Sequence, residues 1–259
     1  MKSMHATARR GLTLIELIVV LMILVGLAGI LIPAMTSMVG RTHTATASAN
    51  IASVANAIQR FETQYMSYPN NFDSLMTALT TGNELPSLST ELFNGIATDP
   101  LVEVALPADT AAALNEAGIT ALGLHSATAG TFDLPASFDT LADGDVVLGL
   151  SASQQVSLGL ETVGIANKYV CFGVGTSCTM NGKTMMEAPV HFPENGTANP
   201  ADVYGRFIAV FQITSGDLAA TPPVAPEALE RAKLVAVISP HGDGLGGHLA
   251  EYFEIAEQD

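Results

Sequence analysis

The apolar residues of the chain are concentrated in one block near its start. No residue from Leu17 to Ile32 has a polar side chain, and the block as a whole runs from Leu12 to Ile32. An α-helix of this length is about 31 Å long at 1.5 Å per residue, close to the hydrocarbon thickness of a bilayer. The pattern therefore predicts a transmembrane helix over residues 12–33, and the basic residues before it predict a cytoplasmic start.

The helical pattern continues past Pro33, where a kink or break is expected, but it becomes polar apart from one narrow seam. The members of this apolar seam, spaced three and four residues apart, are Ile51, Val54, Ile58, Phe61 and Tyr65. This spacing predicts an amphipathic continuation of the helix over residues 34–68. We expect the seam to pack on the chain's own sheet and residues 44–52 to pack on neighbouring helices. A core helix without an assembly role fits the seam equally well.

Residues 69–259 are predicted to form a globular head. Runs rich in β-branched and aromatic residues, separated by turn signals, predict strands. These predicted strands are 146–150, 168–174, 190–192, 203–213, 233–239 and 248–255. Short helices are predicted up to 79 (capped by Asn71 or Asp73), at 108–117 and at 226–232, with an irregular insertion over about 82–145. The predicted fold is α+β: a long N-terminal helix, transmembrane in its first half, on an antiparallel β-sheet.

Charge and composition narrow the possible functions. The 259 residues include 10 Lys+Arg and 25 Asp+Glu, for a formal net charge of −15. A surface this acidic repels phosphate backbones, so no nucleic-acid contact is expected. The hydrophobic share of 48% is too high for a disordered acidic protein. Two cysteines are too few for a disulfide framework or a four-cysteine zinc site.

Glu16 is an acid inside the apolar block. A carboxylate within a bilayer costs on the order of 2.5–3.5 kcal/mol, so it requires a partner unless it reaches the polar interface near the helix end. A secretory signal would have a shorter apolar segment and a small-residue cleavage site. A twin-arginine signal, suggested by Arg9 and Arg10, would be less hydrophobic.

Residues 9–17, RRGLTLIEL, together with the aliphatic run that follows, resemble the class III leader and first helix of type IV pilins and type II secretion pseudopilins. The resemblance implies a leader over residues 1–11 that a prepilin peptidase removes between Gly11 and Leu12. It also implies N-methylation of Leu12 and an assembly role for Glu16. The carboxylate of one chain would then neutralise the new amino group of its neighbour, since each charge is costly alone in an apolar setting.

The implied function is that of a structural subunit of a pilus or pseudopilus filament, not of an enzyme. No nucleophile elbow, phosphate loop or metalloprotease motif occurs in the chain. The pair Tyr68-Pro69 followed by Leu75 resembles pseudopilins and favours type II protein secretion. The alternatives are a type IV pilin-like fibre for adhesion or DNA uptake and a membrane-tethered binding domain.

The resemblance also implies partners and a location. The expected partners are copies of the chain, other pilin-like subunits, the prepilin peptidase, an inner-membrane assembly platform and membrane lipid. The expected location is the bacterial inner membrane, crossed once, with the head outside the cytoplasm, followed by a periplasmic or surface filament.

Two further motifs carry possible chemistry in the head. Cys171 and Cys178 flank a glycine-containing hexapeptide, and outside the cytoplasm they could close a hairpin as a disulfide or remain buried thiols. A zinc site would require histidines 191, 241 and 248 to converge, and their spacing in sequence does not predict this.

The loop 237–248 resembles the calcium-binding C-terminal loop of major pseudopilins, with Ser239 and Asp243 as oxygen ligands. No second acid follows soon after Asp243, so a plain glycine-rich turn is the alternative. No other cofactor is expected.

Overall fold

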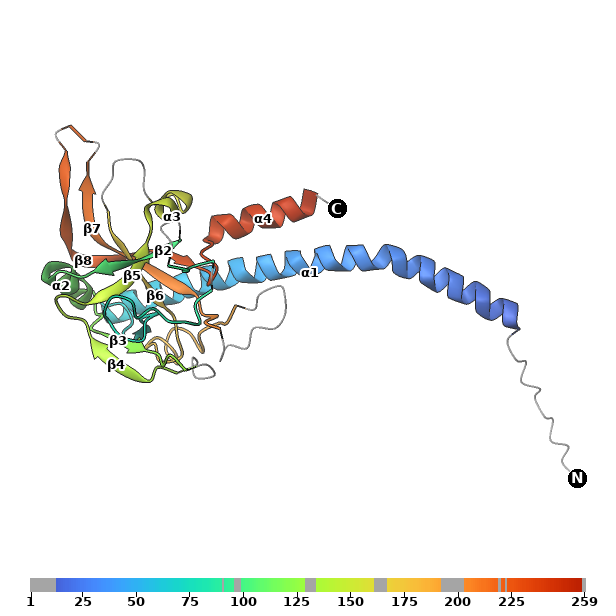
Figure 1. The fold of residues 1–259 in the computed structure, drawn as a ribbon, viewed down its shortest axis with the longest axis horizontal. Coiled ribbons are helices and arrows are strands. Elements are labelled where there is room, and N and C mark those ends of the chain that lie inside the picture. Colours follow the sequence, from blue (N-terminus) through green and yellow to red (C-terminus); the bar gives the residue numbers. More distant parts are fainter. Residues whose placement is uncertain are drawn as a thin grey trace, which may run out of the picture.

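The computed structural model describes residues 13–257, apart from residue 90, 96–98, 129–133, 161–166, 192–202, 219 and 222. Figure 1 shows a head made of strands and short helices, from which one helix extends far to one side. The C-terminal helix lies beside the base of this extended helix.

The extended helix, α1, spans Leu14–Tyr65, 52 residues. It begins at the N-cap Thr13, whose side chain accepts a hydrogen bond from the Glu16 backbone N–H. It passes position 33 without a break, so of the two expectations for that proline, a kink or a break, the break is wrong. It ends where Met66 adopts a left-handed conformation, with φ of 58°, before Pro69 can act as the terminator.

The predicted transmembrane first half of this helix, residues 12–33, requires correction. Among the residues that the structure describes, none of the helices combines the length and the apolar character needed to cross a membrane. The single-pass inner-membrane location is withdrawn together with the predicted span.

The head contains one eight-stranded sheet with the order β2-β5-β6-β1-β3-β4, and β7 pairs with both β6 and β8. The strands are β1 Phe72–Asp73, β2 Leu101–Ala105, β3 Ala121–Leu124, β4 Ser137–Thr140, β5 Val146–Leu150, β6 Tyr169–Gly173, β7 Ile208–Asp217 and β8 Val224–Ile238. The helices of the head are α2 Ala108–Glu116, α3 Ala152–Ser157 and α4 Leu245–Glu257.

The sheet is mixed, so the predicted antiparallel sheet is wrong. β1 pairs with β3 in parallel, while its other neighbour, β6, is antiparallel. A parallel pair needs a long connection, and here β2 and α2 lie between the two strands in sequence. Most of this connection lies in the predicted irregular insertion over 82–145. The same segment also contains β3 and β4, two strands that its polar composition did not predict.

Two other local predictions were wrong near the C-terminus. Residues 226–232 belong to the long strand β8 instead of a proline-initiated helix, because they pair with β7 across Thr214 and Ser215. Residues 248–255 form most of helix α4 instead of a strand. Residues 71–79, predicted to end in a short helix, contain β1 and an isolated bridge from Met76 to Glu84.

Both faces of the sheet are covered. On one face the seam of α1, including Val54 and Ile58, packs with Phe172 and Phe211 in one buried cluster. On the other face Cys171 and Val210, which alternate with those residues along β6 and β7, join a second buried cluster. The seam therefore packs on the chain's own sheet, as expected, with Tyr65 at its end left 48% exposed.

Candidate functional site

The largest unpartnered feature of the described chain is the first half of α1, here called the arm and defined as Leu14–Val39. In Figure 1 the arm projects beyond the head and beyond α4. Its large apolar side chains are exposed instead of buried, among them Leu14, Ile15, Leu17, Ile18, Val19, Val20, Leu21, Met22, Ile23, Leu24, Val25, Leu27, Leu31, Ile32, Met35, Met38 and Val39.

The exposure of the arm extends around the whole helix. The four consecutive residues from Leu17 to Val20 are between 46% and 54% exposed. Because successive residues of an α-helix point in directions about 100° apart, four in a row cover every side. A helix that is apolar all round is normally enclosed on all sides. Within the described chain, nothing encloses the arm.

Glu16 lies at the start of the arm and has a partner that the sequence analysis did not assign. Its carboxylate Oε2 accepts hydrogen bonds from the backbone N–H and the hydroxyl of Thr13, both at 2.8 Å. Together with the bond from the Glu16 N–H to Thr13, this is a capping box, which the T-x-x-E spacing could have revealed. The bond from the Thr13 backbone is the main reason that the pKa of Glu16 is lowered, so the carboxylate is charged at neutral pH.

Gly11 and Leu12, the predicted cleavage pair and methylation site, lie outside the described residues. Cleavage there would leave the new amino group on the residue bonded to Thr13, the N-cap of α1. The assembly role of Glu16 is likewise untested, although the carboxylate stands at the exposed end of the arm.

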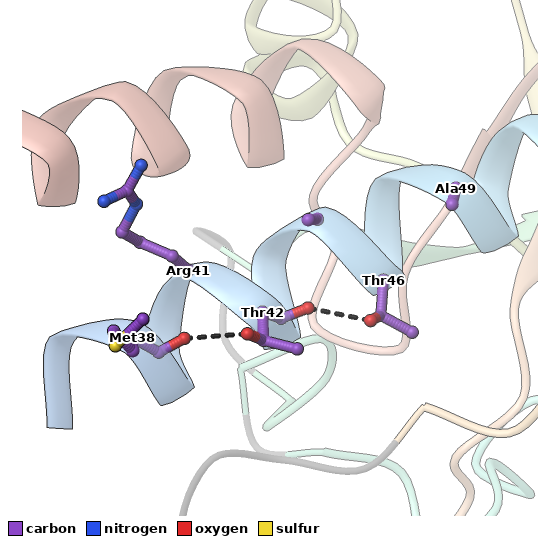
Figure 2. A pocket seen from close by; sticks show the side chains of 6 residues that line it. Met38, Arg41, Thr42, Thr46 and Ala49 are labelled. Atoms are coloured by element: carbon purple, nitrogen blue, oxygen red, sulfur yellow. Dashed lines mark hydrogen bonds between the residues drawn. The ribbon is translucent and has the colours of Figure 1, made fainter. Parts of the chain in front are cut away.

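Between the arm and the head, α1 has a shallow groove, shown in Figure 2. It is lined by small and long side chains that repeat every three to four residues: Met38, Arg41, Thr42, Ala45, Thr46 and Ala49. The Arg41 side chain extends from α1 toward α4 in this view. Further grooves follow along α1, one of them reaching Arg60.

The threonines of this groove present their apolar methyl groups at the surface. The Thr42 hydroxyl donates to the Met38 carbonyl at 2.8 Å, and the Thr46 hydroxyl donates to the Thr42 carbonyl at 2.7 Å (Figure 2). Hydroxyls bonded to their own helix in this way leave the threonine methyl groups at the surface. With the alanines, these methyl groups allow another helix to approach closely.

A buried polar cluster lies inside the head at β1. The hydroxyl of Tyr204 donates to Asp73 Oδ2 at 2.8 Å, and His125 Nε2 lies 3.2 Å from Asp73 Oδ1. All three residues are about 2% exposed. Burial is the main reason that the pKa of Tyr204 is raised, with Asp73 adding to it. The grooves along α1 are lined by other residues, and this buried cluster joins β1 to the neighbouring parts of the head.

Cys171 and Cys178 are free, buried thiols in the structure, not the predicted disulfide. The strand β6 places Cys171 in the cluster on one face of the sheet, while Cys178 belongs to the cluster on the α1 face. After β6 the chain turns, and the Cys178 N–H donates a hydrogen bond to the Gly175 carbonyl. The expected hairpin is not formed. Burial raises the pKa of Cys178 to about 12 and raises that of Cys171 further, so both thiols are protonated and unreactive.

The proposed calcium ligands Ser239 and Asp243 form a turn at the start of α4. The buried Ser239 hydroxyl accepts the N–H groups of His241 and Asp243 at 3.3 and 3.2 Å. The Ser239 N–H donates to the Asp243 carbonyl at 2.8 Å. Ser239 therefore acts as a turn cap. Within the described part of the chain, no three His, Cys, Asp or Glu side chains are already close enough to hold a metal ion.

The structure does bring together the three histidines whose convergence the sequence could not predict. The ring centroids of His191 and His241 are 5.0 Å apart, and those of His191 and His248 are 6.3 Å apart. His43 on α1 also acts on His191 electrostatically. Burial, followed by these neighbouring imidazoles, lowers the pKa of His191 to about 4, so its ring is neutral at pH 7.

Compared with known proteins, the chain matches no family model, no curated protein and no solved structure. The resemblance to pilin-like subunits is thus carried by the residues that show it, chiefly 9–17. A functional conclusion has to come from the site itself. The arm is the feature of the described chain that most clearly requires a partner.

Proposed function

We propose that the chain is a structural, non-catalytic subunit of a pilus- or pseudopilus-like filament, in which the arm packs against the arms of other copies. The observation that supports this most directly is the exposure of apolar side chains on every side of the arm. Each Leu, Ile or Val side chain that becomes fully buried contributes about 1.5–3 kcal/mol. The arm therefore favours assembly strongly.

The distribution of these side chains favours a many-membered assembly over a dimer. A two-stranded coiled coil buries one narrow stripe of each helix, at the a and d positions. In a dimer, the outer sides of the arm would remain exposed to water. Only an arrangement in which each arm is surrounded by several others buries all of its sides. Head-to-tail packing that does not close produces such a filament.

The groove between arm and head fits the same arrangement. Its alanines and threonine methyl groups allow the polar part of one α1 to lie close to another. Of residues 44–52, which were expected to pack on neighbouring helices, Thr44, Ala47, Ser48 and Ile51 are already buried within the chain. Only the exposed side with Ala45, Thr46 and Ala49 belongs to this proposal. The acidic heads would then lie at the filament surface, where their charge limits further association.

Glu16 and the leader give the assembly its register in this proposal. Removal of residues 1–11 creates an amino group at Leu12, and the charged Glu16 carboxylate of one chain pairs with the Leu12 amino group of the next. Both hydrogen bonds from Thr13 go to the same oxygen, Oε2. The pseudopilin-like sequence at Tyr68 and Pro69 favours a role in protein secretion over a fibre for adhesion or DNA uptake.

Electron microscopy and sedimentation of the chain without its leader, residues 12–259, and of a charged variant of it test the proposal. Val20→Asp places a carboxylate in the middle of the arm, and we expect it to abolish filaments. Thr63→Asp, at an exposed position in the head half of α1, is the matched control and should assemble normally. A wild-type chain that stays monomeric, or a Val20→Asp variant that assembles like wild type, would refute the filament function.

A further inference from the structure

Four of the chain's six histidines gather where α1, α4 and the segment around Val190 meet. His191 follows the bridge between Val190 and Arg206, His241 lies in the turn between β8 and α4, and His248 lies on α4. His43 and His191 together line a pocket of about 160 Å³ against α1. These side chains come from elements far apart in sequence.

The spacing of the rings is that of ligands to one ion. Two imidazoles that bind one tetrahedral Zn²⁺ through Zn–N bonds of about 2.0–2.1 Å have ring centroids about 5 Å apart. The observed separations from the His191 ring are 5.0 Å to His241 and 6.3 Å to His248. The first separation already matches, and the second requires only a small inward shift.

Carboxylates lie near the Nδ1 atoms of two of these rings. His241 Nδ1 is 2.5 Å from Glu91 Oε2, and His248 Nδ1 is 3.7 Å from Glu251 Oε2. A carboxylate on one ring nitrogen fixes the tautomer and directs the other nitrogen toward a metal, an arrangement common around zinc. In His241, whose Nδ1 is hydrogen-bonded to Glu91, this leaves Nε2 as the ligand atom. In His248 neither ring nitrogen has a hydrogen-bond partner, so either one can serve as the ligand.

His248 provides an independent sign that a ligand is missing. The residue is 5% exposed, and neither of its ring nitrogens has a hydrogen-bond partner. Leaving a buried polar atom without a partner costs about 1–3 kcal/mol. An ion bound to one of these nitrogens would remove its share of this cost.

We propose that His191, His241 and His248 bind one zinc-class transition-metal ion that fastens α4 to the turn after β8 and to the segment around Val190. The rings as they stand do not yet surround a common point, so binding turns them inward. Imidazole nitrogens suit Zn²⁺, Co²⁺ and Ni²⁺ and do not suit Ca²⁺. The ion is therefore distinct from the calcium considered for Ser239 and Asp243, and its binding does not depend on the filament function.

Calorimetric titration of the metal-free full chain with Zn²⁺ tests this proposal. We expect one ion per chain, and His241→Gln and His248→Gln should each weaken binding by at least about tenfold. Glu91→Gln, which removes the carboxylate beside His241, should weaken binding by about 10–100-fold. Asn50→Ala, which changes a residue of the same pocket but no ligand, is the matched control and should bind as wild type does.

A spectroscopic readout keeps the test independent of folding defects. Co²⁺ in the wild-type chain should give the absorption of tetrahedral nitrogen and oxygen ligation, without a thiolate charge-transfer band. Zinc should also slow amide hydrogen exchange in α4. Binding that all three variants leave unchanged, a thiolate band from Cys171 or Cys178, or the absence of any zinc binding would overturn the proposal.

Discussion

The two halves of α1 are one continuous helix in two opposite environments. In the head half, Val54 and Ile58 are fully buried against the sheet, whereas in the arm Val20 and Leu24 are more than half exposed. The residue types are similar, and so is the helical backbone. Helix formation therefore does not decide whether these side chains are buried. The presence of a partner surface decides it: the head provides one for its own half, and in the filament that we propose other copies provide one for the arm.

The largest effect is expected when a buried residue in the head half of α1 is truncated and compared with an exposed residue truncated in the arm. Ile58→Ala should lower the free energy of unfolding of the head by about 2–5 kcal/mol, because it leaves a cavity against the sheet. Leu24→Ala, the matched truncation in the arm, should change it by no more than about 0.5 kcal/mol, as expected for an exposed position. Denaturant unfolding of the head measures both values. An equal loss in the two variants would contradict the proposed division of the helix.

A smaller effect is expected from two glycines, one in each region. A Cβ at Gly175 would collide with the carboxylate of Asp73, so Gly175→Ala should destabilise the head by about 1–3 kcal/mol. A Cβ at Gly26 in the arm meets nothing within 4 Å, so Gly26→Ala should leave the unfolding of the head unchanged. If Gly26→Ala reduces filament formation while the head unfolds as in the wild type, this result supports close approach of neighbouring arms.

The pH dependence of assembly tests whether the charged carboxylate of Glu16 is needed. Its pKa is lowered by the Thr13 backbone bond. A stabilising effect of the charged carboxylate is therefore present above the ordinary glutamate range and lost as the pH falls through the lowered pKa. We expect filaments of the wild type to dissociate only in strong acid. Glu16→Gln should assemble weakly at every pH, and sedimentation measures both. Assembly of Glu16→Gln equal to wild type at neutral pH would exclude the charge pairing.

The smallest effect concerns the surface ion pair that fastens the end of α1 to β8. Arg231 lies 2.8 Å from Glu62, and both side chains are partly exposed, by 38% and 29%. Such a pair contributes at most about 1 kcal/mol. Glu62→Gln should lower the free energy of unfolding of the head by no more than that, and less at high salt. A loss of several kcal/mol in thermal or denaturant unfolding would show that the end of α1 carries more of the fold than its burial indicates.

Patterns that depend on neighbours in sequence were the ones that predicted structure. The apolar seam gave the buried face of α1, and the run 146–150 coincides with β5. The parallel pairing of β1 with β3 and the convergence of the histidines depend on contacts across dozens of residues. No local pattern encodes those contacts. Pro226 suggested a helix start, yet pairing with β7 placed it in a strand.

The candidate site divides in the same way. The apolar character of the arm and the position of Glu16 at its start are visible in the first residues, and so is the T-x-x-E spacing of the capping box at Thr13. The exposure of the arm was not predicted. The predicted membrane span was wrong because length and composition alone do not identify the partner of an apolar helix. The thiols of Cys171 and Cys178 are close in sequence but lie on opposite faces of the sheet, which spacing does not show.

Site-specific photo-cross-linking from the middle of the arm tests the central claim most directly. A photoreactive residue replaces Leu24 in the chain without its leader, residues 12–259, and the products are separated by size after illumination under assembly conditions. We predict a ladder of two, three, four and more linked chains, because each arm is surrounded by several others. Products that stop at the dimer, or chains that remain unlinked, would contradict the account.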